Sequence, residues 1–150
     1  MLTDTASITN VVGEIFQDSI LDNPNFKICQ NQDGIVQYYA FPEKTYRGEK
    51  STLIQHFKNG YHPVQTINET GLIRIRFVVN CDGETGRFRL LAMDSEYQKK
   101  EFSSNIIRQL LALTKSYKGW KAMQANGNYR DYYQYLIFKI ENGQLIDILP

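Results

Sequence analysis

The stretch TGLIRIRFVVNCDGETGRFRLL (residues 70–91) contains two runs in which apolar side chains alternate with arginines. A period of two is typical of strands that bury one face and leave the other in water. Asp82-Gly83 and Gly86 supply the residue types of a tight turn between the two runs. The stretch therefore predicts a hairpin of strands 72–80 and 86–92. It also predicts a shared face, called here the arginine face, that carries Arg74, Arg76, Arg87 and Arg89.

Apolar residues at helical spacing predict a helix over residues 6–20, a short helix that begins near Ser51, and a longer one over 100–116. Short apolar runs at 26–29 and 35–39 flank a turn sequence and predict an N-terminal hairpin. Trp120 follows the last helix, and we expect its side chain to close the core.

The segment DYYQYLIFKI (131–140) predicts a long strand that is apolar on both faces. Because a helix separates it from the strand at 86–92, an all-antiparallel sheet requires it to pair with the strand at 72–80. The predicted fold is therefore α+β in two layers, with 72–80 central, 86–92 and 131–140 flanking it, and two helices on one face. Asn142-Gly143 and the following LIDIL predict one further arm, which we expect to fold onto the outer edge of the 131–140 strand and occlude it.

Several of these features together resemble the TonB C-terminal domain family. They are the alternating strand that begins at Gly71, the turn at Asp82-Gly83, Trp120 after an amphipathic helix, Asn126-Gly127, and a closing strand rich in tyrosine and phenylalanine. The match covers about residues 50–140. It divides the chain into a TonB-like domain at 51–150 and an N-terminal helix and hairpin extension at 1–50 that packs on it.

The resemblance implies a non-catalytic protein-interaction module in the periplasm or cell envelope of a Gram-negative cell. Family members bind a short segment of an outer-membrane transporter as an added strand. That role implies a protein or peptide partner here, with dimerisation through a sheet edge as a further option. The residues that would contact the partner lie on the edge strand and on the exposed arginine face: Tyr133, Tyr135, Ile137, Arg74, Arg76, Arg87 and Arg89.

The arginine face has two interpretations. A basic surface with neighbouring tyrosines suits a polyanion, either an acidic glycan or single-stranded nucleic acid. It also suits the wet side of an antiparallel sheet. The chain carries 17 Lys and Arg against 16 Asp and Glu, a formal net charge of +1. Because this balance gives no overall attraction to nucleic acid, we predict a solvated face and no nucleic-acid partner.

Cys29 and Cys81 are the two cysteines. A catalytic thiol or a zinc site would have to recruit His56 and His62, and no motif or paired spacing supports either, so we expect no cofactor and no metal. Buried free thiols and a disulfide remain. Both cysteines lie beside predicted turns, and the TonB resemblance implies an oxidising compartment, so we predict a Cys29–Cys81 disulfide.

No recognised catalytic motif occurs, so the sequence predicts a protein that is not an enzyme. No apolar run approaches the roughly 20 residues that span a bilayer. The N-terminus also lacks the basic start and apolar core of a signal peptide. The sequence is therefore compatible with a cytoplasmic protein or with the loss of a leader or anchor, and the resemblance favours the second.

Overall fold

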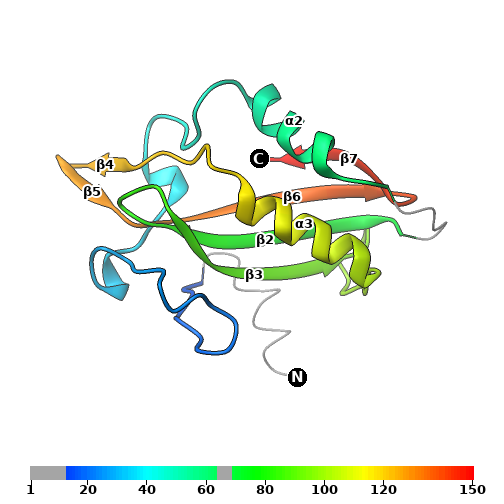
Figure 1. The fold of residues 1–150 in the computed structure, drawn as a ribbon, viewed down its shortest axis with the longest axis horizontal. Helices are drawn as coiled ribbons and strands as arrows, with labels where there is room; N and C mark the ends of the chain where they lie inside the picture. Colours follow the sequence, from blue (N-terminus) through cyan, green and yellow to red (C-terminus); the bar gives the residue numbers. More distant parts are fainter. Residues whose placement is uncertain (1–12, 64–68) are drawn as a thin grey trace.

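The computed structural model describes residues 13–63 and 69–150. The α+β fold is confirmed (Figure 1). The helices and strands are, in order, β1 (Val36–Gln37), α2 (Lys50–Gly60), β2 (Gly71–Val79), β3 (Thr85–Met93), α3 (Ser104–Ser116), β4 (Met123–Ala125), β5 (Asn128–Arg130), β6 (Tyr132–Glu141) and β7 (Gln144–Leu149), with short 3₁₀ turns on either side of β1.

The main sheet has the strand order β1-β6-β2-β3, and β7 also pairs with β6. As predicted, β2 is central and pairs antiparallel with both β3 and β6. The sheet is nevertheless mixed, because β1 runs parallel to β6. β4 and β5 form a separate two-stranded hairpin whose turn contains Asn126 and Gly127, both at positive φ.

α2 and α3 cover one face of this sheet, and α3 crosses in front of β2 and β3 while α2 lies beside β7 (Figure 1). Ile73, Ile75 and Phe77 of β2 are fully buried beneath them. The side-chain hydroxyl of Ser103 caps α3 by accepting from the N–H of Ile106 at 3.4 Å. Trp120 is buried in this core, as expected, against Phe77 and Tyr117.

The helix predicted over residues 6–20 is wrong for its described part, since residues 13–20 form no helix; residues 6–12 lie outside the described residues. Local side-chain hydrogen bonds explain the difference. The Asp18 carboxylate accepts from the N–H groups of Ile20 and Leu21, and the Asp22 carboxylate accepts from the N–H of Asp18. Short acidic side chains that bond to nearby backbone in this way favour turns over helices.

The predicted N-terminal hairpin is also wrong. Residues 26–29 form no strand, and the backbone N–H of Cys29 donates instead to the side chain of Asp131. Val36 and Gln37 pair with Tyr132 and Tyr133 of β6 rather than with residues 26–29. From here on, "the extension" means residues 13–35. The extension packs on the main domain and forms no hairpin of its own.

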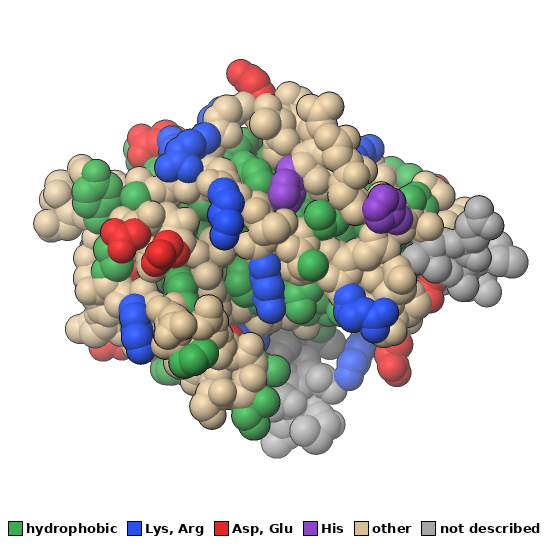
Figure 2. All heavy atoms as spheres, in the orientation of Figure 1, with side chains coloured by type: hydrophobic (Ala, Val, Ile, Leu, Met, Phe, Trp, Pro, Cys, Tyr) green, Lys and Arg blue, Asp and Glu red, His purple; other side chains and the backbone are tan. Residues whose placement is uncertain are grey.

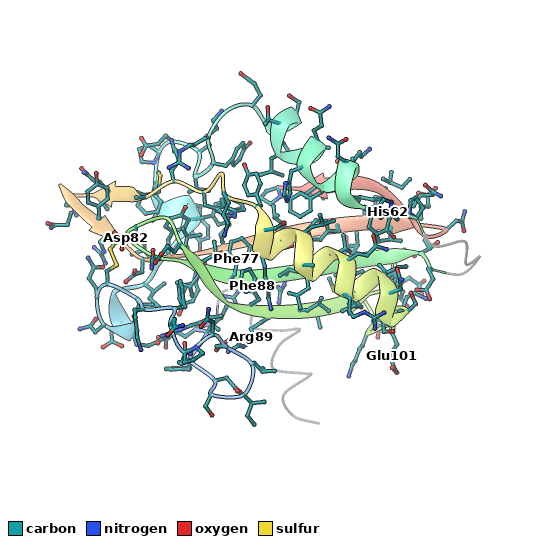
Figure 3. The ribbon with its side chains drawn as sticks, in the orientation of Figure 1. His62, Phe77, Asp82, Phe88, Arg89 and Glu101 are labelled. Carbon is teal, nitrogen blue, oxygen red and sulfur yellow. A yellow bond between two sulfur atoms is a disulfide. The ribbon has the colours of Figure 1, made fainter. Side chains whose placement is uncertain are left out.

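The extension lies on the sheet face opposite the helices and adds a partial third layer. A second apolar cluster joins the two, with Ile15 and Phe26 from the extension packed against Val78 and Tyr133 from the sheet. The two faces of the sheet therefore meet different partners. In Figure 3, Phe77 and Phe88 point toward α3, while Arg89 lies on the opposite side of the sheet among side chains of the extension.

Candidate functional site

Strand register brings the predicted arginine-face residues together. Arg76 lies opposite Arg89 on one neighbour of β2 and opposite Tyr135 on the other, so the three side chains share one face of the sheet. A β-bulge, at which Arg87 and Phe88 together oppose Phe77, adds Arg87 at φ +58°. The geometric part of the prediction is thus confirmed.

The predicted solvation of this face is wrong. Arg74, Arg76 and Arg87 are only 8%, 7% and 7% exposed, and the extension accepts hydrogen bonds from Arg76 and Arg87. Burial lowers the pKa of Arg74 and of Arg76. The guanidinium of Arg76 lies 5.4 Å from the ring centre of Tyr133 and donates a hydrogen bond to the carbonyl of Gly13. The arginine face is an internal interface of the folded chain.

Arg89 and Asp22 form the ion pair that fixes the extension. Both terminal nitrogens of Arg89 lie 2.8 Å from a carboxylate oxygen of Asp22, which is the two-pronged geometry of strong arginine–carboxylate pairs. The hydrogen bond from Arg89 is the main reason that the pKa of Asp22 lies below its ordinary value, and it raises the pKa of Arg89.

Hydrogen bonds between neutral groups of the extension and side chains of the arginine face and Tyr133 complete the contact between the extension and the sheet. Arg87 donates to the Ile15 carbonyl at 2.9 Å and to the side-chain oxygen of Gln32 at 2.8 Å. The hydroxyl of Tyr133 accepts from the N–H of Ile15 at 3.1 Å and from Gln32 at 3.2 Å. Burial raises the pKa of Tyr133. These contacts use most of the polar groups that a polyanion would need on this face.

The predicted binding edge, on β6, is occupied by the chain itself. β1 pairs with Tyr132 and Tyr133, and β7 pairs antiparallel along Ile137–Glu141. The arm therefore occludes the edge as expected, and among the predicted edge residues only Tyr135 lies between the two added strands. Asn142 and Gly143, at φ 50° and 77°, form the tight turn that returns β7 onto β6.

The predicted disulfide joins Cys29 to Cys81, with the two Cα atoms 5.9 Å apart and 52 residues apart in sequence. A buried carboxylate that the sequence analysis missed supports it. Asp131 accepts from the backbone N–H groups of Cys29, Gln30 and Cys81 at 2.9–3.1 Å. In the sequence, the sign of this role was the position of Asp131, an acidic residue directly before an apolar strand.

The cysteines and histidines do not meet. His56 lies on α2, where its ring contacts the carbonyl of Leu113 at 3.0 Å. Within residues 13–63 and 69–150, the one acid, cysteine or histidine cluster with metal-ligand spacing is Cys29, Cys81 and Asp82. The two sulfur atoms of that cluster are bonded to each other, so it offers no thiolate pair to a metal.

The opposite edge of the sheet, along β3, borders a groove of about 600 Å³. Its walls are residues 21–26 of the extension on one side and the end of α3 on the other, and its floor is the β2–β3 turn and the first residues of β3. Figure 2 shows apolar side chains at the surface between α3 and the extension, with basic side chains nearby. No strand from the described part of the chain pairs with this side of β3.

Comparison with known proteins returned no match to a family model, a curated protein or a solved structure. Over residues 13–63 and 69–150 the structure defines the class of fold, an α+β domain with α2 and α3 on a mixed sheet and a disulfide-linked extension. A disulfide indicates a compartment outside the reducing cytoplasm. In the described residues, no helix has the length and apolar character needed to cross a membrane.

Proposed function

We propose that this protein is a non-catalytic, TonB-like interaction module of the cell envelope that binds an extended segment of a partner protein by strand addition. The order helix, hairpin, helix and strand, with the first hairpin strand at the centre of the sheet, supports the resemblance on which this proposal rests. The Cys29–Cys81 disulfide supports an oxidising compartment such as the periplasm.

The observation that carries the proposal is the asymmetry of the two sheet edges. The β6 edge has already accepted two strands of its own chain, β1 and β7. The β3 edge has no such partner among the described residues, apart from its last residues, where Lys99 and Lys100 meet Met93 and Ala92. A free edge offers a row of backbone N–H and C=O groups to an incoming strand.

Displacement of β7 is the costlier route to a binding edge. Leu145 and Ile148 of β7 are buried in the main core. Their transfer to water would cost about 3–6 kcal/mol in total, at roughly 1.5–3 kcal/mol for each side chain. Binding through the β6 edge would have to recover this energy, whereas binding through the β3 edge does not.

The alternative function, polyanion binding on the arginine face, has less support. Arg87 and Arg89 donate to the extension, and Arg76 and Tyr133 lie beneath it. A polyanion would have to detach the extension, break the Arg89–Asp22 pair and expose the apolar cluster around Phe26. Each of these steps opposes binding.

Selection of random linear peptides against the oxidised chain tests the proposal. We expect enrichment of strand-forming peptides whose affinity is lost when alternate amides are N-methylated, since this change removes backbone donors and keeps the side chains. A heparin fragment serves as the polyanion control. Failure to enrich any peptide, or saturable heparin binding without peptide binding, would contradict the proposal, as would recovery of the native protein from the cytoplasmic fraction.

A further inference from the structure

The groove beside β3 has the charge of a selective binding site. Arg87, Lys115 and Lys118 line it together with the carboxylates of Asp22 and Glu84. Asp22 is neutralised by Arg89, which leaves three cations against one carboxylate, an excess of two positive charges. The hydrogen bonds of Arg87 go to neutral groups of the extension, and its charge is one of the smaller causes that lower the pKa of Asp22.

Two lysines form the basic wall on the α3 side. The ammonium group of Lys115 lies 5.5 Å from the ring centre of Phe88, at the floor of the groove. Among the described residues, the single ion pair is Arg89–Asp22, so neither Lys115 nor Lys118 has a carboxylate partner there. Both ammonium groups are therefore available to an acidic ligand at the rim.

The opposite wall combines the apolar Leu21 and Phe26 with Asp22, Asn23 and Asn25, and close packing and hydrogen bonds hold it in place. Phe26 packs so closely on Gly86 that a Cβ atom at that position would lie 2.3 Å from the phenyl ring. Leu21 lies above it and is 64% exposed, next to Ile20, which is 90% exposed. The Asp18 carboxylate fixes this loop by accepting from the N–H groups of Ile20 and Leu21. Neighbouring exposed apolar side chains beside a groove are typical of an interaction surface.

We propose that this groove binds an extended, acidic segment of the partner protein, with apolar side chains against Leu21 and Phe88 and carboxylates at Lys115 and Lys118. The inference rests on the proposed function and adds the site and the chemistry of the ligand. A concave site beside a free strand fits one extended chain. The carboxylates of Asp18 and Asp22 beside the apolar loop disfavour an anionic lipid surface as the occupant.

Fluorescence anisotropy with synthetic peptides tests the inference at pH 7. The acidic probe is a labelled peptide of four Val-Glu repeats, and the matched probe is four Val-Lys repeats. We expect the full chain to bind the acidic probe at least about tenfold more tightly than the basic one. Lys115→Glu combined with Lys118→Glu should weaken acidic-probe binding by at least about tenfold and improve binding of the basic probe.

Lys58→Glu combined with Lys139→Glu is the matched control, because both lysines are exposed and lie outside the groove. This control should change either affinity by less than about twofold, and circular dichroism of all variants should match that of the parent chain. Equal binding of the two probes, or acidic-probe binding that the groove variant leaves intact, would overturn the site while leaving peptide binding in place. Absence of binding to every peptide would overturn the proposed function as well.

Discussion

The carboxylate of Asp131 accepts a hydrogen bond from the backbone N–H of Cys81 at 3.1 Å, and it also holds the N–H of Cys29, the other half of the disulfide. Asp131 is fully buried and lies directly before β6. It therefore joins the extension, the β2–β3 turn and the β6 strand at one point. The disulfide closes a long loop, which contributes roughly 4 kcal/mol in the chain-entropy model. The Asp131 carboxylate accepts hydrogen bonds from the backbone N–H groups of the two cysteines that the disulfide joins.

Asp131→Asn should destabilise the oxidised protein by about 2–4 kcal/mol, because the amide keeps one acceptor oxygen and turns an N–H₂ donor toward other donors. Urea unfolding of the oxidised variant measures this loss. Asp33→Asn is the control, since Asp33 is exposed, and it should change the free energy of unfolding by less than about 0.5 kcal/mol. Equal stabilities of the two variants would show that Asp131 does not organise this junction.

Asp22→Asn should destabilise the protein by about 1–3 kcal/mol at pH 7 through loss of the ion pair to Arg89. The pKa of Asp22 is lower in the folded state than its ordinary value of 3.8. Stabilisation by the ionised pair is therefore complete above that value, and it is lost as the pH falls through the lower folded-state pKa. Urea unfolding between pH 7 and pH 2 should show the parent chain approaching the variant in acid.

Glu43→Gln, at an exposed carboxylate, is the control and should change the free energy of unfolding at pH 7 by less than about 0.5 kcal/mol. A gap between the parent and Asp22→Asn that stays constant down to pH 2 would contradict the assignment of this pH dependence to the Asp22–Arg89 pair.

Gly86→Ala should loosen the extension, because the added Cβ atom would lie 2.3 Å from the ring of Phe26. Overpacking of this kind costs about 1–3 kcal/mol. Limited proteolysis and urea unfolding measure the effect, and we expect faster cleavage within residues 13–28. Gly34→Ala, where a new Cβ meets its nearest atoms at 3.4 Å, is the control and should leave both measurements close to those of the parent. Unchanged proteolysis of Gly86→Ala would place Phe26 away from β3.

Ile148→Ala and Ile146→Ala separate the core role of β7 from its role as an edge. Ile148 is fully buried and Ile146 is 44% exposed on the same strand. We expect a loss of about 2–4 kcal/mol for Ile148→Ala and less than about 1 kcal/mol for Ile146→Ala. Similar small losses would indicate that β7 is a loosely attached arm.

Deletion of residues 144–150 should expose the β6 edge and promote dimerisation, which light scattering would detect.

The sequence was sufficient for the elements whose periodicity is long and regular. β2, β3, α3 and β6 all follow from alternating or helical runs, and the topology follows from the helix between β3 and β6. The placement of β7 was likewise predictable, because Asn142-Gly143 leaves few ways to continue the chain. These features depend on local residue preferences and on one geometric constraint.

The extension could not be predicted in the same way. Its apolar residues, Ile15 and Phe26, have helical or strand-like spacing, yet their partners Val78 and Tyr133 are far away in the sequence. Burial of Arg76 and Arg87 depends on the same long-range contact. In the sequence, an arginine that alternates with apolar residues gives the same pattern whether its side chain donates hydrogen bonds to water or to a backbone carbonyl. The groove beside β3 exists only because the extension forms one of its walls.

Residue-resolved amide hydrogen exchange, with and without the saturating Val-Glu peptide, is the most direct test of strand addition at the free edge. We expect new protection of amides within residues 86–91 and unchanged exchange in β6 and β7, because an added strand bonds to the edge that it joins. New protection confined to residues 132–149, or none anywhere in the chain, would contradict it.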